Sequence, residues 1–217
     1  MPITDDIKLD IYNDALIVLG SRRLLTLSED RKPRHVLDDV WGTDNKIVIR
    51  ALERADWNFA SRTVKGSYDP SITPDFGWRR AFRKPSDCVR MTTISGDEFL
   101  RTPMTHESYS DQEGYWLCSL DEIYVRFVSS DESYGFNSGL WPQSFRDLVS
   151  AMLAEWACEP INNSTDKLAV CIARQERALG VAKSRDSQDE GTKFPPAGSW
   201  VLSRGREARD RRRTFNQ

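Results

Sequence analysis

Residues 142–160, which read PQSFRDLVSAMLAEWACEP, carry the clearest structural pattern in the chain. Their large apolar residues recur at intervals of three and four positions, which is the repeat of one face of an α-helix. These residues are Phe145, Leu148, Val149, Met152, Leu153 and Trp156. Pro142 suits the opening of a helix and Pro160 suits its end. We therefore predict a helix between the two prolines, with one wide apolar face in a core.

Three further stretches show helical patterns. In residues 4–19 the apolar residues recur at helical spacing, and Gly20 follows as a stop. Residues 33–57 keep an apolar stripe that Gly42 interrupts, which fits either a kinked helix or two shorter helices. Residues 164–184 form a last helical stretch. We expect these helices to pack together, with Trp41, Trp57, Phe59, Phe145 and Trp156 in their core.

Residues 61–130 have a different character, because they combine four prolines and several glycines with short runs of β-branched and aromatic residues. This composition is typical of strands and loops. Residues 115–120 and 123–129 look like the two strands of a β-hairpin, with the turn at Asp121-Glu122.

The order of these patterns predicts an α+β protein. We expect residues 1–60 and 140–184 to form a helical bundle, and residues 61–139 to form an inserted antiparallel β-rich domain. After residue 184 the periodicity stops, so residues 185–217 are expected to be an extended C-terminal tail.

The tail differs from the rest of the chain in charge. Six arginines against two acids give residues 204–217 a charge of +4, so the remaining residues carry −6 of the total net charge of −2. Phe194 and Trp200 stand in otherwise polar surroundings, so they could either anchor the chain in a partner's groove or fold back on their own domain. The residues expected to bind a partner are Phe194, Trp200, Arg204, Arg206, Arg209, Arg211, Arg212 and Arg213.

Motifs for catalysis or ligand binding are missing from the sequence. The two histidines, His35 and His106, belong to no HExxH or GxSxG pattern, and no CxxC pair or phosphate-binding glycine loop occurs. We therefore expect no catalytic residue, no cofactor and no metal site, and a protein that is not an enzyme. The four cysteines have neither zinc nor dense disulfide spacing, so they are interpreted as reduced core residues.

Membrane contact and export are not expected either. No apolar run approaches the roughly 18 residues that a membrane-spanning helix needs. The first ten residues lack the basic and apolar stretches of a signal peptide.

Two alternative functions stay open. A glycosidase that cuts peptidoglycan needs only two carboxylic acids across a cleft, and Glu155 with Glu159, or Asp38 with Asp39, could supply a pair. The arginine-rich end could instead bind nucleic acid through its phosphates. Acids between the arginines and the lack of interleaved aromatic residues make docking on an acidic protein surface an equal interpretation.

Several short motifs, taken in order, resemble the tail tubular protein A family, the head-to-tail adaptor (connector) proteins of T7-like short-tailed bacteriophages. The matching motifs are IYNDAL at 11–16, VLDDVW at 36–41, ADWNFA at 55–60, WRRAF at 78–82, KPSD at 84–87, IYVRFV at 123–128, WP at 141–142, FPP at 194–196 and GSW at 198–200. They extend over most of residues 7–202, whereas residues 203–217 fall outside the resemblance.

The resemblance implies a structural virion protein without catalytic residues. Such a protein would form a homo-oligomeric ring of twelve subunits that joins the portal protein to the tubular tail nozzle, with tail fibres as a further partner. The genome would pass through its channel without specific binding. An acidic body suits a channel along which DNA slides, and a long tail suits clamping a neighbour.

Overall fold

The computed structural model describes residues 3–74, 76–112 and 114–189. The chain divides into two compact units, Met1–Ser187 and Gln188–Gln217. Five α-helices and two antiparallel sheets make up the described residues, which confirms the α+β class. The expected partner-binding residues from Phe194 to Arg213 lie outside the described part of the chain.

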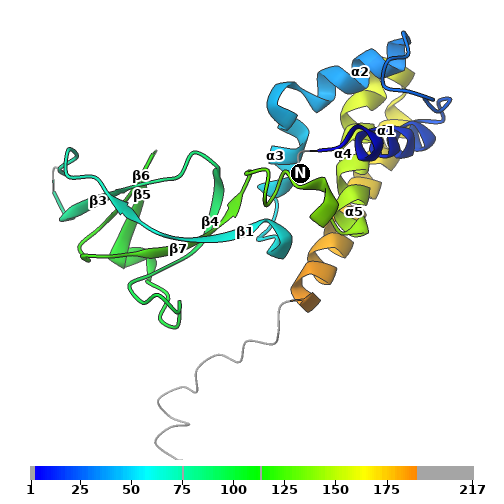
Figure 1. Cartoon of the computed structure of the whole chain (residues 1–217). Helices are drawn as coiled ribbons and strands as arrows, with labels where there is room; N and C mark the ends of the chain where they lie inside the picture. The colour runs from blue at the N-terminus through cyan, green and yellow to red at the C-terminus, as the bar shows by residue number, and fades with distance from the viewer. Residues whose placement is uncertain (1–2, 75, 113, 190–217) are drawn as a thin grey trace, which may run out of the picture. The chain divides into compact units, whose positions relative to one another are not determined.

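Helix α4 (Gln143–Asn162) is the helix that the sequence pattern predicts after Pro142, and it is the centre of the helical part. Helices α1 (Asp5–Leu19), α2 (Lys32–Trp41) and α3 (Lys46–Leu52) all contact it (Figure 1). After α4, Asn163 adopts a left-handed conformation, and the chain then enters α5 (Thr165–Asp189).

Glycine and asparagine residues set the helix boundaries. Gly20 has a φ of 71° at the end of α1, a conformation that glycine adopts without strain. The apolar stripe of residues 33–57 forms two helices instead of one kinked helix. The break contains Gly42 and the left-handed Asp44 and Asn45, and the Trp41 indole N–H donates to Asn45 Oδ1 at 2.8 Å.

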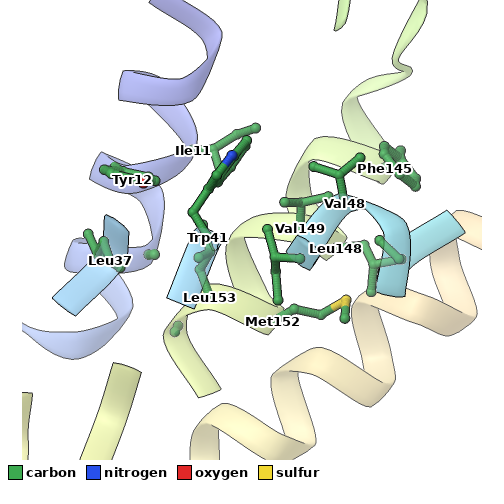
Figure 2. Packing of buried hydrophobic residues seen from close by; sticks show 14 of the residues in the cluster. Ile11, Tyr12, Leu37, Trp41, Val48, Phe145, Leu148, Val149, Met152 and Leu153 are labelled. Carbon is green, nitrogen blue, oxygen red and sulfur yellow. The ribbon is translucent and has the colours of Figure 1, made fainter. Parts of the chain in front are cut away.

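The main apolar core lies between α4 and the first three helices (Figure 2). Phe145, which is fully buried, makes edge-to-face contacts with three other aromatic rings. The ring centroids of Trp57, Phe59 and Trp141 lie 5.1, 4.8 and 5.2 Å from that of Phe145. The expected core positions of Trp41, Trp57 and Phe145 are confirmed, whereas Phe59 is only half-buried.

Two predictions for the end of α4 are wrong. Trp156 is 52% exposed, although the guanidinium of Arg50 of α3 stacks 4.3 Å from its ring centroid. Pro160 does not end the helix, which continues to Asn162. The hydrogen bond that proline removes would have gone to the backbone carbonyl of Trp156, close to the solvent-exposed end of the helix.

The strands form two sheets (Figure 1). The three-stranded sheet has the order β1 (Ser61–Lys65), β7 (Tyr124–Ser129), β4 (Cys88–Ser95). The four-stranded sheet has the order β2 (Ser67–Tyr68), β3 (Arg80–Arg83), β6 (Tyr115–Cys118), β5 (Tyr109–Gln112).

The predicted hairpin of residues 115–120 and 123–129 is wrong. Both segments are strands, but β6 pairs with β3 and β5, whereas β7 pairs with β1 and β4. Residues 119–123 therefore carry the chain from one sheet to the other. Trp116 and Phe127 meet within the shared apolar core instead of lying side by side on one sheet.

Strand β7 belongs to two cores. Val125 and Phe127 point into the core between the sheets, whereas Val128 belongs to the core of the helical part. Alternate residues of a strand face opposite sides, so one strand can serve both cores.

Helix α5 extends to Asp189, so the predicted start of the extended tail at residue 185 is wrong. Polar contacts hold the last turns of this helix. The Asn58 backbone N–H donates to both carboxylate oxygens of Asp186, at 3.0 and 3.2 Å, and the Asn58 amide donates to the Asp186 carbonyl at 2.7 Å. Hydrophobic periodicity gives no signal for such a contact.

Candidate interaction surfaces

The first predicted carboxylate pair, Asp38 and Asp39, has a structural role. Asp38 accepts hydrogen bonds from the Tyr12 hydroxyl at 2.9 Å and from Arg34 Nη1 at 2.7 Å. Burial and the neighbouring Asp38 raise the pKa of Tyr12 far above its usual range, so its hydroxyl stays a donor. Asp38 thus ties α1 to α2, while Asp39 is exposed.

The second predicted pair, Glu155 and Glu159, lies one turn apart on α4, with Glu155 half-buried and Glu159 exposed. Side chains at this spacing are neighbours on the same side of a helix. A glycosidase needs its two acids on either side of the scissile bond, which this arrangement does not offer.

A cavity of about 510 Å³ lies between α1, α4 and α5. We call it the helical groove. It is lined by Asp14, Ile17, Ser144, Asp147, Ser150, Arg174, Arg177, Ala178 and Val181. The structure thus brings together acids, arginines and exposed aliphatic side chains from three helices. None of these acids or arginines was predicted, because their positions in the sequence are far apart and no motif connects them.

Asp14 is the acid at the centre of this charge cluster. Loss of water around it raises its pKa, as do the charges of Asp147 and Asp10, while Arg23 and Arg174 oppose the increase. Asp14 also borders a second cavity of about 240 Å³ that contains Asp10, Arg23 and Arg146. Acids and arginines therefore surround Asp14 together, and the positive charges of the arginines partly offset the repulsion between the acids.

Replacing Asp14 by asparagine is expected to stabilise the protein at pH 7. A raised pKa in the folded state means that ionised Asp14 destabilises folding, and this penalty grows as the pH rises from the ordinary pKa of 3.8. Solvent still reaches the residue, so the gain should stay below about 1 kcal/mol. Urea unfolding of wild type and Asp14→Asn between pH 3 and 7 measures it.

The matched control for this prediction is Asp39→Asn, because Asp39 is an exposed helical carboxylate. The advantage of Asp14→Asn should vanish at a pH below 3.8, where both states are protonated. A variant that is less stable than wild type at pH 7 would contradict the assignment.

One side of α5 remains exposed along the helical groove. Val170, Arg174, Arg177 and Val181 follow one another at helical spacing, and we call them the α5 flank. Val170 is 64% exposed and Val181 is 44% exposed. The adjacent side of the helix meets the protein core through Cys171, Gln175 and Ala182, which are buried.

A third cavity, of about 300 Å³, lies on the four-stranded sheet. We call it the aromatic pocket. Its lining residues are Ile72, Thr73, Pro74, Phe76, Trp78, Gln112, Tyr115 and Leu117. Phe76 is 89% exposed, which is the highest value among the large exposed hydrophobic residues of the described chain. No individual residue here was predicted as a binding residue.

Other features that bear on function concern metals, cysteines and membranes. Within the described residues, no group of three or more histidines, cysteines and acids could hold a metal ion.

All four cysteines are free, and burial raises the pKa of Cys171, which lies beside Cys158, to about 11. Among the helices that the structure describes, none is long and apolar enough to cross a membrane.

No protein-family model matches the chain, and no curated protein sequence matches it.

Proposed function

We propose that the chain is a structural subunit of a bacteriophage particle, the head-to-tail adaptor whose ring joins the portal protein to the tail nozzle. The proposal starts from the resemblance of the motifs between residues 7 and 202 to the tail tubular protein A family. It includes a homo-oligomeric ring of twelve subunits, a channel for the genome and a location in the virion tail. No catalytic step or cofactor belongs to it.

Helix α5 is the observation that best supports a role in assembly. The helix has 25 residues, and at about 1.5 Å per residue it is some 37 Å long. Only Cys171, Gln175 and Ala182 are buried in the single chain. Helices in proteins gain most of their stability by packing one face against other elements, so a long and largely exposed helix suits a subunit that packs against neighbours.

The α5 flank has the chemistry of a subunit contact. Full burial of a valine or isoleucine side chain contributes about 1.5–3 kcal/mol, and Val170 and Val181 stand on either side of two arginines. Arginine is enriched at protein interfaces, because its planar head makes several directed hydrogen bonds. Val181 also lines the helical groove, beside the exposed Ile17 of α1.

Charge is consistent with a DNA channel. Outside residues 204–217 the chain has a net charge of −6. A ring of acidic subunits repels the phosphate backbone and so allows DNA to slide without binding. The basic end of the chain is available for an acidic partner such as a neighbouring protein.

The double substitution Val170→Asp with Val181→Asp is expected to abolish ring formation. Two carboxylates would lose their hydration in the contact, at a cost of several kcal/mol, while in the single chain both positions are open to solvent. Negative-stain electron microscopy of the protein mixed with its portal protein, together with sedimentation of the protein alone, tests this.

The matched control is Ala169→Asp, an exposed position on the same helix but on the side facing away from the groove. It should assemble like wild type. If the double variant forms normal rings, the α5 flank is not the subunit contact. If wild-type protein never forms a ring with the portal protein, the adaptor function itself is wrong.

A peptidoglycan hydrolase is the second candidate, and the helical groove is the observation in its favour. Asp14 and Asp147 come from different helices and face one cavity, unlike the pairs expected from the sequence. The pKa of Asp14 is raised, which is the direction of shift that lets a carboxyl group keep a proton and act as a general acid. Incubating the purified protein with cell-wall material decides between the two functions: release of soluble fragments that Asp14→Asn abolishes would support hydrolysis.

A further inference from the structure

We propose that the aromatic pocket receives the segment Phe194-Pro195-Pro196 of a second copy of this chain. The inference rests on the proposed function in one respect, because it needs several copies to assemble. It goes further by naming both halves of one contact between neighbouring subunits.

The pocket lies on the face of β6 that points away from the core between the sheets. Trp116 and Cys118 belong to that core, so Tyr115 and Leu117 face the opposite side. Leu117 is only 5% exposed, and together with Tyr115 it lines the pocket alongside Ile72, Pro74 and Phe76 of the chain between β2 and β3. The result is a hollow in which a buried leucine and a half-buried tyrosine meet apolar side chains that remain open to solvent.

The rim of the pocket carries large apolar side chains that are open to solvent. Phe76 is 89% exposed and Ile72 is 37% exposed, while Trp78 and Tyr115 are half-buried. Apolar area exposed in this way is unfavourable in water and is typical of binding surfaces. A partner that covers Phe76 would therefore gain hydrophobic free energy.

The chemistry of the pocket suits a proline-containing segment. Consecutive prolines favour the extended polyproline II conformation, which binds in grooves lined by aromatic side chains at a low entropic cost. Proline has no backbone N–H, so such a segment presents mainly carbonyl acceptors. Trp78 and Gln112 carry an indole N–H and an amide N–H₂ that can donate to these carbonyls.

Within this chain, Phe194-Pro195-Pro196 matches these requirements. It combines an aromatic ring with two consecutive prolines, and it follows Asp189, the last described residue of α5, after a short stretch. Trp200 lies four residues further on and supplies a second ring.

The length of chain favours a second copy over the same copy. Asp186 is bound to Asn58, so α5 ends beside the start of β1, and β1 then runs toward the four-stranded sheet (Figure 1). The pocket is on that four-stranded sheet, where Tyr115 and Leu117 of β6 line it. The five residue steps from Asp189 to Phe194 span at most about 18 Å. To reach the pocket of its own copy, the segment would have to run back from the end of α5 along β1 toward the four-stranded sheet. The segment of a neighbouring subunit does not need this path.

Peptide binding tests the pocket directly. The receptor is the full chain carrying Phe194→Ala, Pro195→Ala and Pro196→Ala, so that its own segment does not compete. The probe is a fluorescently labelled peptide of residues 191–202, and fluorescence anisotropy reports binding. Adding Phe76→Ala to the receptor should weaken binding at least tenfold. Phe99→Ala, at a residue that is 65% exposed and outside the pocket, should leave binding unchanged.

A mixing experiment tests the role of the second copy. Full-length Phe76→Ala protein retains its tail, and the triple tail variant retains its pocket, so the two together can form one intact contact. Sedimentation velocity should detect complexes in the mixture of the two variants. A solution of either variant alone should lack the complexes that depend on this contact. Circular dichroism confirms that both are folded.

Clear outcomes would overturn the inference. These are the absence of peptide binding, equal binding to the Phe76→Ala receptor, or no complex when the two variants are mixed. Rings that form normally with the portal protein from the Phe76→Ala and triple tail variants would remove this contact and leave the adaptor function intact. Failure of wild-type protein to form rings would count against the adaptor function alone.

Discussion

Replacing Phe145 by alanine is expected to lower the free energy of unfolding by about 3–5 kcal/mol, which is the usual cost of deleting a buried phenylalanine. Phe145 is fully buried on α4 and contacts the rings of Trp57, Phe59 and Trp141. Each edge-to-face pair adds about 0.5–1.5 kcal/mol beyond the area buried. Urea unfolding followed by far-ultraviolet circular dichroism measures the loss.

Phe99→Ala is the control for Phe145→Ala, because Phe99 is 65% exposed. Its removal should change the free energy of unfolding by less than about 0.5 kcal/mol, as for most surface substitutions. A Phe145→Ala protein that loses no more stability than the Phe99→Ala protein would show that the aromatic cluster is not the centre of the core.

Gly135→Ala is expected to destabilise the protein by about 1–3 kcal/mol through overpacking. A Cβ atom at this buried glycine would overlap the Ser129 carbonyl oxygen and would lie 2.8 Å from Leu52 Cδ1. The Gly135 N–H also donates to that same carbonyl at 3.1 Å, so the two segments cannot move apart without losing a hydrogen bond. Thermal unfolding provides the measurement.

Gly180→Ala provides the matched comparison. Gly180 lies within α5, and a Cβ atom there meets nothing within 4 Å. Alanine is the better helix former, so this variant should gain about 0.5–1 kcal/mol. The same chemical change is thus expected to have opposite signs at the two sites. Equal effects would contradict the close approach of residues 129 and 135.

The candidate surfaces were only partly predictable. Phe194 and Trp200 stood out in the sequence as candidate anchors, because aromatic side chains are unusual in a polar stretch. Asp14, Asp147 and Arg174 did not stand out, since they come from three helices and each looks like an ordinary surface charge. The same applies to Phe76 and Tyr115, which look like isolated aromatic residues until the fold places them around one hollow.

Local patterns in the sequence by themselves determined the helices and the α+β class. Apolar residues at helical spacing, with Gly20 and Gly42 as breaks, act through the backbone of a single segment and so can be recognised without the rest of the chain. The same holds for the existence of β6 and β7 as strands.

Only the tertiary structure decided which segments meet. It assigned β6 and β7 to different sheets, exposed Trp156 beside Arg50, and held the end of α5 through Asp186 and Asn58. The physical reason is that the pairing of strands and the burial of a side chain depend on partners far away in the chain. Alternation and helical spacing show which side of a segment is apolar, but the element that covers that side is chosen by the packing of the whole fold.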